Sequence, residues 1–86
     1  MKLRIVKSFT GRATVKDTSS VGEIIRQLRK ESKLTQAKAA ALCNVGPRFL
    51  SDLENGKSTI QLGKALRVLR AFGLLVILKK KNLTNE

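Results

Sequence analysis

Apolar residues recur at helical spacing in two parts of the chain, which predicts a mainly helical domain. In the first part, residues 20–31, they follow the i, i+3, i+4, i+7 pattern of an amphipathic helix with one buried face: Val21, Ile24, Ile25, Leu28. Ser20 and Glu23 form the S-x-x-E pattern of a capping box, so this helix is expected to begin at Ser20. We expect it to end near residues 31–33.

A second helical pattern covers residues 58–73. Ser58 and Gln61 again have capping-box spacing, and Gly73 is a suitable C-terminal stop. Five apolar residues are expected to form the buried stripe of this helix: Leu62, Ala65, Leu66, Leu69, Phe72. Three basic residues fall on its other side and are expected to be exposed: Lys64, Arg67, Arg70.

Between these two patterns, residues 34–57 predict two short helices joined by a tight turn. The first would be capped by the Thr35 hydroxyl and run through small apolar residues to Cys43, an expected core residue. Ala40 must be small, because two helices that cross steeply leave no room there for a branched side chain. Asn44 follows where a left-handed conformation is needed to reverse the chain.

The second short helix is expected to have Gly46 as its N-cap and Pro47 as its first residue. Leu50 and Leu53 would face the core, and Gly56 would end the helix after about residue 55. Two helices joined by such a turn are the helix-turn-helix that inserts its second helix into the DNA major groove.

Outside residues 19–73 the pattern changes. Residues 74–78 are fully apolar and too short for another helix, so we expect a strand whose exposed edge pairs with a second copy of the chain: Leu74, Leu75, Val76, Ile77, Leu78. Residues 79–81 complete that dimerisation segment, and residues 82–86 are expected to fray. Residues 1–18 are expected to form a basic, extended arm with one possible strand at Lys2–Lys7. Its basic side chains are either solvated or follow the phosphates or an adjacent minor groove of DNA.

The charge of the chain narrows its partners. The 86 residues carry 18 Lys and Arg against 6 Asp and Glu, a formal net charge of +12, which indicates a polyanionic partner. Membrane anchoring is not expected, because the longest apolar run is far too short to span a bilayer. Residues 1–9 lack the apolar core of a signal peptide, so we expect a cytoplasmic protein. So small a domain gains stability by dimerising.

Enzymatic chemistry is not expected. The sequence has no histidine, its six acidic residues and single cysteine show no metal-ligand spacing, and no glycine-rich phosphate loop is present. We therefore expect neither a cofactor nor a metal. RNA binding is disfavoured, because three Phe and no Trp or Tyr leave little surface for stacking bases.

The helix-turn-helix reading assigns two sets of DNA contacts. Base contacts are expected around the start of the second helix, by side chains and by close backbone approach: Gly46, Pro47, Arg48, Ser51, Asp52. For Asp52, an alternative is a pair with a neighbouring Lys or Arg, and for Phe49 we favour packing over contact with a thymine methyl. Phosphate contacts are expected from the start of the first helix and from the residues that follow the second: Thr35, Gln36, Lys38, Asn55, Lys57, Ser58.

With Leu34-Thr35-Gln36 and Leu53-Glu54-Asn55-Gly56 in place, the chain resembles the Cro/CI-type (XRE) helix-turn-helix family. The segments 48–57 and 61–69, together with the apolar run after Gly73, are similar to the HipB-like antitoxins. These resemblances imply a lambda-repressor-like fold of four to five helices, with C-terminal strands that pair across a dimer. They also imply a partly buried ion pair between Arg29 and Glu54.

The resemblance to HipB-like proteins further implies a function. It suggests a homodimeric autorepressor of a palindromic, double-stranded DNA operator that also neutralises a HipA-like serine/threonine kinase toxin. The alternative is a stand-alone repressor of the same family, without a toxin partner. The sequence alone leaves both open.

Overall fold

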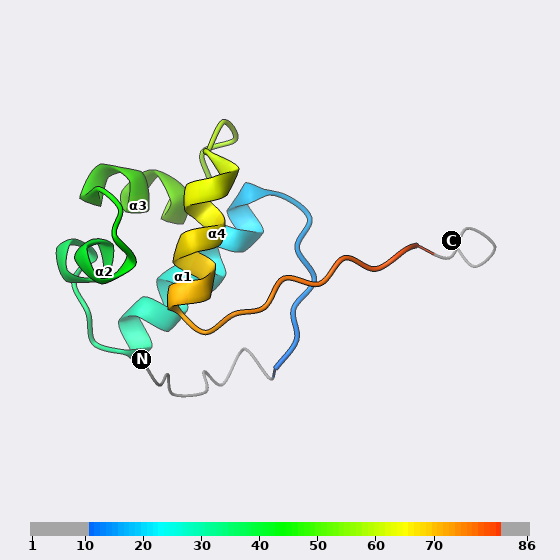
Figure 1. Ribbon diagram of the computed structural model, residues 1–86, viewed down its shortest axis with the longest axis horizontal. Helices are drawn as coiled ribbons and strands as arrows, with labels where there is room; N and C mark the ends of the chain where they lie inside the picture. Colours follow the sequence, from blue (N-terminus) through cyan, green and yellow to red (C-terminus); the bar gives the residue numbers. More distant parts are fainter. Residues whose placement is uncertain (1–10, 82–86) are drawn as a thin grey trace.

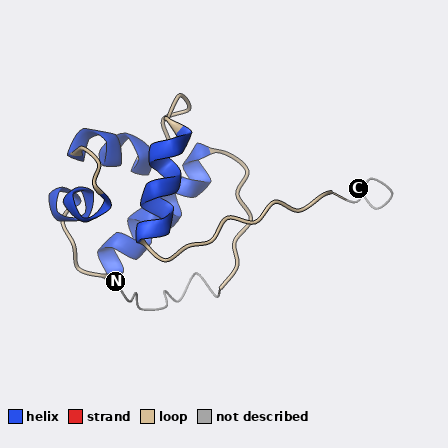
Figure 2. Cartoon of the chain, viewed as in Figure 1, coloured by secondary structure: helices blue, strands red, loops and turns tan. Residues whose placement is uncertain are grey.

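The computed structural model describes residues 11–81, whose regular secondary structure is helical (Figures 1 and 2). This part of the chain contains four helices: α1 (Thr18–Glu31), α2 (Gln36–Cys43), α3 (Pro47–Glu54) and α4 (Leu62–Ala71). α3 packs against both α1 and α2, and α4 packs against α2. The predicted mainly helical architecture is confirmed. None of the described helices is long and apolar enough to cross a bilayer.

The core draws residues from every helix. It contains the following buried apolar side chains: Ile25, Leu28, Ala39, Ala40, Cys43, Leu50, Leu53, Ala65, Val68, Phe72. Ala39 and Ala40 are both 0% exposed, so these two small side chains of α2 are enclosed in the core between the helices. The requirement for a small residue at Ala40 therefore agrees with its position.

The start of α1 differs from the prediction. Its N-cap is Asp17, whose carboxylate Oδ1 accepts hydrogen bonds from the Ser20 backbone N–H at 2.9 Å and from the Ser20 hydroxyl at 3.0 Å. Ser20 therefore lies inside the helix, and the predicted capping box with Glu23 was wrong. Asp is as good an N-cap as Ser, and Asp17 caps the helix three residues before the predicted N-cap, Ser20.

α1 meets the end of α3 at very short distance. A Cβ atom on Gly22 would clash with the backbone carbonyl oxygens of Leu53 and Glu54, so only glycine fits there. One turn earlier, the Thr18 hydroxyl donates a hydrogen bond to the carbonyl of Gly56 at 2.8 Å. Gly56 has φ of +75°, a left-handed conformation that favours glycine, and it follows the end of α3 as predicted. These contacts hold the first turn of α1 against the turn that follows α3.

The start and stripe of α4 also required correction. The helix begins at Leu62, and Gln61 is its N-cap without a side-chain hydrogen bond, so the predicted capping box at Ser58 is absent. Leu62 is 68% exposed rather than buried, whereas Val68 is fully buried. The buried stripe of α4 is centred on Ala65, Val68 and Phe72. The predicted stripe residues Leu66 and Leu69 are half-buried at its edges.

The segment after α4, residues 74–81, has no regular secondary structure in this single chain. Leu74 packs against the core, but the next four residues are strongly exposed: Leu75 83%, Val76 53%, Ile77 75%, Leu78 94%. In Figure 1 the segment runs away from the helices. A strand needs a neighbour to accept its hydrogen bonds, so the dimerisation strand remains a prediction about two chains. The predicted strand at Lys2–Lys7 and the tail 82–86 lie outside the described residues.

Candidate nucleic-acid interface

The turn between α2 and α3 has the geometry that the sequence predicted. The Thr35 hydroxyl accepts a hydrogen bond from the Lys38 backbone N–H at 3.1 Å and so caps α2. Asn44 adopts the left-handed conformation, with φ of 59° and ψ of 45°. Its N–H and that of Val45 bond to carbonyls in the last turn of α2, at 3.1 and 3.0 Å. α2 and α3 are thus joined by a tight, hydrogen-bonded reversal.

α3 begins with residues that leave its first turn open. Gly46 is the N-cap and makes no side-chain cap bond, and Pro47 is the first helical residue. A Cβ atom at Gly46 would meet no heavy atom within 4 Å. Because Leu50 and Leu53 are buried in the core, the opposite face of α3 is directed outward. The start of the helix is therefore accessible to a large ligand.

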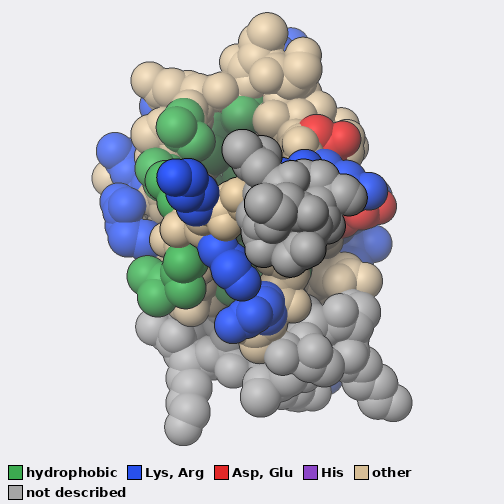
Figure 3. Space-filling model, turned by 90° about the vertical axis from the view of Figure 1, so that its right-hand side faces the viewer, with side chains coloured by type: hydrophobic (Ala, Val, Ile, Leu, Met, Phe, Trp, Pro, Cys, Tyr) green, Lys and Arg blue, Asp and Glu red, His purple; other side chains and the backbone are tan. Residues whose placement is uncertain are grey.

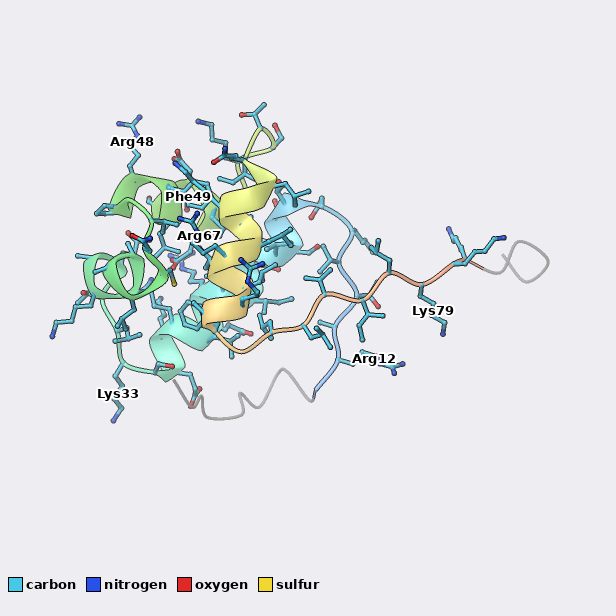
Figure 4. The ribbon with its side chains drawn as sticks, in the orientation of Figure 1. Arg12, Lys33, Arg48, Phe49, Arg67 and Lys79 are labelled. Carbon is cyan, nitrogen blue, oxygen red and sulfur yellow. The ribbon has the colours of Figure 1, made fainter. Side chains whose placement is uncertain are left out.

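Arg48 is the exposed cation at this end of α3. Figure 4 shows its side chain directed away from the helical body, so its guanidinium is free to reach a base edge or a phosphate. Ser51 and Asp52 are each half-buried on the same helix. Asp52 Oδ2 lies 3.6 Å from Lys57 Nζ, which agrees with the alternative of a neighbouring lysine partner. That pair partly offsets the negative charge of the carboxylate on this face of α3.

The residues expected to contact phosphate lie at two places. Thr35, Gln36 and Lys38 are at the start of α2, and the rest are in the turn after α3: Asn55, Lys57, Ser58. All are exposed except Gln36, which is half-buried. The Gln36 amide Nε2 donates a hydrogen bond to Glu54 Oε1 at 3.0 Å. Its side chain is therefore already held by the protein before any phosphate arrives.

Arg29 and Glu54, the pair implied by the resemblance, form a buried ion pair. Arg29 Nε lies 2.6 Å from Glu54 Oε2, and Arg29 Nη2 lies 3.0 Å from Oε1. The remaining guanidinium nitrogen, Nη1, donates to the Leu34 carbonyl at 2.8 Å. In the described part of the chain, no buried side-chain nitrogen or oxygen lacks a partner. The network ties α1, the loop before α2 and the end of α3 into one unit.

Two side chains on α4 brace the motif in a way that the sequence did not reveal. Arg67 Nη1 donates to the Asn44 carbonyl at 2.9 Å, and Lys64 Nζ lies 5.8 Å from the centroid of the Phe49 ring. Figure 4 labels Phe49 on α3 and Arg67 on α4. The sequence identified Lys64 and Arg67 only as exposed cations three residues apart. Their partners lie 15 and 23 residues away, beyond any local pattern.

Other chemistry has little support among the described residues. Burial raises the pKa of the Cys43 thiol, which keeps it protonated and disfavours a nucleophilic or ligating role. No group of three His, Cys, Asp or Glu side chains that could hold a metal ion occurs in residues 11–81. What this surface offers is cations, amides and helix N-termini, the groups that bind a phosphate backbone.

Comparison with known proteins identifies the family. The model of the Helix-turn-helix family HTH_3 matches residues 25–75, which include the whole of α2, α3 and α4. The chain belongs to the XRE-type helix-turn-helix family. It is a DNA-binding transcriptional regulator. A curated relative from Sinorhizobium fredii is 44% identical over 59 residues, which cover 69% of this chain and 78% of the relative. That protein is described as an uncharacterized HTH-type transcriptional regulator, y4mF.

Solved structures share the fold of this XRE-type regulator. HipB in a HipA-HipB-O2-O3 complex superposes with a TM-score of 0.72 at 15% identity, covering 83% of this chain and 100% of that chain. HipB in a HipB-O4 20mer complex gives the same TM-score, identity and coverage. At such identities the likeness shows the fold, including the placement of the helix-turn-helix.

Proposed function

We propose that this regulator is a homodimeric autorepressor of a palindromic operator. The observation that supports DNA reading most directly is the exposed start of α3, where Arg48 projects beside an N-cap without a side chain. In a dimer, two such helices enter successive major grooves about 34–36 Å apart. Arg48 contacts a guanine or phosphate, Ser51 and Asp52 contact bases one turn on, and backbone at Gly46 and Pro47 approaches the groove floor.

Phosphate contacts lie on both sides of the exposed start of α3. The start of α2 supplies Thr35, Gln36 and Lys38, and the turn after α3 supplies Asn55, Lys57 and Ser58. The buried network supports this arrangement, because Gln36 donates a hydrogen bond to Glu54, the last residue of α3, which also accepts one from Arg29. A phosphate held by Gln36 would thereby fix the angle at which α3 enters the groove.

The homodimer is supported by the exposed apolar side chains of residues 75–78. Four consecutive large hydrophobics between 53% and 94% exposed are a liability in an isolated chain. Pairing of this segment with its copy in a two-fold dimer covers them and satisfies the strand hydrogen bonds together. The homodimer proposal assigns Leu74, Leu75, Val76, Ile77 and Leu78 to this interface.

The antitoxin role is the finer part of the proposal. The chain has the fold of HipB, a protein solved in complex with HipA, and it matches that HipB chain over its full length. We infer that this regulator neutralises a HipA-like serine/threonine kinase. The alternative is a stand-alone repressor, and the curated relative is described as an uncharacterized HTH-type transcriptional regulator.

One experiment separates these functions. The tagged full chain is recovered from cells of its source organism after mild crosslinking, and the bound proteins and bound DNA are identified together. A matched preparation of Arg48→Ala reports which DNA depends on the recognition helix. A HipA-like kinase recovered with DNA from beside the protein's own gene supports the antitoxin and autorepressor. Specific DNA recovered without a kinase supports the stand-alone repressor. If Arg48→Ala recovers the same specific DNA as the wild type, the role of Arg48 is overturned.

A further inference from the structure

Lys64 occupies an unusual position for a surface lysine. It lies in the first turn of α4, it is exposed, and its ammonium group is 5.8 Å from the centre of the Phe49 ring. Phe49 is the third residue of α3, directly after Arg48. The contact therefore joins α4 to the part of the recognition helix that is most accessible.

Phe49 provides a fixed platform. Its side chain is half-buried and packs against the core that contains Leu50 and Val68, so the ring cannot move freely. The exposed part of such a ring attracts a cation through its quadrupole, with an energy that is largest when the cation loses some of its water. A lysine side chain otherwise samples many rotamers, and the contact restricts that freedom.

Among the described residues, the structure shows no ion pair between Lys64 and a carboxylate. The Glu54 carboxylate pairs with Arg29 and the Asp52 carboxylate pairs with Lys57, and neither pairs with Lys64. α4 itself contains no acidic residue. The nearby Arg67 adds a second positive charge while its guanidinium is bonded to the Asn44 carbonyl. The ammonium of Lys64 is thus held in place beside α3 without being neutralised.

We propose that Lys64 contacts a DNA phosphate next to the recognition helix and that Phe49 is its positioning residue. This rests on the proposed entry of α3 into the major groove, and it extends the interface to α4, beyond the two sites flanking α3. It also gives Phe49 a role other than reading a thymine methyl: the ring places a cation against the backbone, so its effect on binding passes through Lys64.

The test measures binding of the full chain to a 24-base-pair duplex of random sequence over a salt series. Each neutralised phosphate contributes about 0.9 to the slope of log affinity against log salt. Lys64→Gln should therefore reduce that slope by about 0.9. The ratio of wild-type to variant affinity should shrink by about threefold between about 50 and about 200 mM salt.

Arg70→Gln is the matched control. Arg70 is exposed on the same helix, six residues after Lys64, and its loss removes the same formal charge. If net charge alone matters, Arg70→Gln and Lys64→Gln will change the slope equally, and the proposal is wrong. Lys64→Arg retains a cation over the ring and should keep the wild-type slope.

Phe49→Leu separates positioning from direct contact. It should weaken binding about two- to fivefold, as expected for loss of an exposed cation–π contact. In the Lys64→Gln background, the same change should have no further effect. An undiminished effect there would mean that Phe49 contacts the DNA itself and would overturn its positioning role. Thermal unfolding of each variant identifies any loss that reflects stability.

Failure of the proposal is distinguishable from failure of DNA binding as such. If the wild type does not bind the duplex at any salt concentration, the proposed DNA-reading function fails. If the wild type binds with a steep salt dependence and Lys64→Gln binds identically, only the assignment of Lys64 and Phe49 fails.

Discussion

The helical body, residues 18–73, and the segment after it, residues 74–81, use apolar residues in opposite ways. In the body, the large hydrophobics such as Ile25, Leu50 and Val68 are fully buried, and no buried side-chain polar atom of the described residues lacks a partner. In the segment, Leu75 and Leu78 are 83% and 94% exposed. Figure 3 views this end of the molecule and shows hydrophobic side chains interspersed with lysines and arginines.

The difference shows that one chain completes the body but not the segment. In the body, polar groups find hydrogen-bond partners in local helix caps and in the network around Glu54, all within a single copy of the chain. In the segment, four consecutive large hydrophobic residues, 75–78, are left exposed by the rest of the described chain. We therefore expect substitutions in the body to affect folding, and those in the segment to affect assembly.

The largest effect is expected from breaking the body at Arg29→Ala. The Glu54 side chain is only 2% exposed, so its carboxylate would keep Gln36 but lose its charged partner inside the protein. Removing one member of a buried ion pair typically costs about 3–5 kcal/mol. Urea unfolding should show a loss of that order. Arg26→Ala, an exposed arginine on the same helix, is the control and should change stability by less than about 0.5 kcal/mol.

An unchanged melting temperature for Arg29→Ala would remove the structural role assigned to the pair. It would also weaken the comparison above, because the body would then not depend on its internal network.

The second effect concerns the segment. Leu75→Asp should convert the proposed dimer into a folded monomer, because a charge within the paired strands cannot be desolvated. Operator affinity should fall by about a hundredfold, since two linked DNA-binding domains bind far more tightly than one. Sedimentation and circular dichroism measure assembly and folding. Leu42→Asp, at a leucine 61% exposed on α2, should leave the oligomeric state unchanged.

A wild-type chain that sediments as a monomer at all concentrations would contradict the dimer directly. If instead Leu75→Asp unfolds the protein, the segment belongs to the body and the contrast between the two regions is wrong.

A third prediction compares two exposed cations of the body, Arg48 and Lys57, whose substitution should affect DNA binding and not folding. Arg48→Ala should reduce discrimination between operator and random DNA by about 1–3 kcal/mol, as for loss of a bidentate contact to guanine. Lys57→Ala should weaken binding to both duplexes alike, with a smaller salt slope. Competition titrations on the two duplexes measure this. Equal losses for both variants would mean that Arg48 also contacts only phosphate.

The smallest effect is a pH dependence at the start of α1. Hydrogen bonds from the Ser20 backbone and hydroxyl hold the pKa of the Asp17 carboxyl below its usual value. A lowered pKa in the folded state stabilises the protein above the unfolded pKa, and this stabilisation disappears as pH falls through the folded value. Asp17→Asn retains an acceptor for the Ser20 N–H but does not titrate. Its melting temperature should therefore fall less than that of the wild type between about pH 5 and about pH 2.

The sequence predicted the helix-turn-helix in detail because its determinants are local. The Thr35 cap, the left-handed Asn44 and the Gly46-Pro47 start depend on neighbouring residues, and all are present. Both capping boxes failed for a related reason: Ser20 and Ser58 had the right spacing, but other residues began those helices. A short motif cannot tell which of several adjacent polar residues caps a helix.

Contacts between distant residues were the hardest to predict. The Arg29–Glu54 pair came only from family resemblance, and the Gln36 bond to Glu54 was not foreseen. Gly22 falls inside the S-x-x-E pattern at residues 20–23 and was assigned no role of its own, whereas it lets α1 approach the backbone of α3. The contact between Lys64 and Phe49 depends on how α4 crosses α3, which helical periodicity does not specify.

The open N-cap of α3 has a consequence for how such regulators diverge. Gly46 has φ of −73°, which every L-amino acid adopts, and space for a side chain that meets no neighbour within 4 Å. After gene duplication, a single codon change could therefore place Ser, Asn or Asp at the edge of the groove with no cost to folding and a gain of a few tenths of a kcal/mol from capping. New operator preferences could arise at this one position while the rest of the protein stays unchanged.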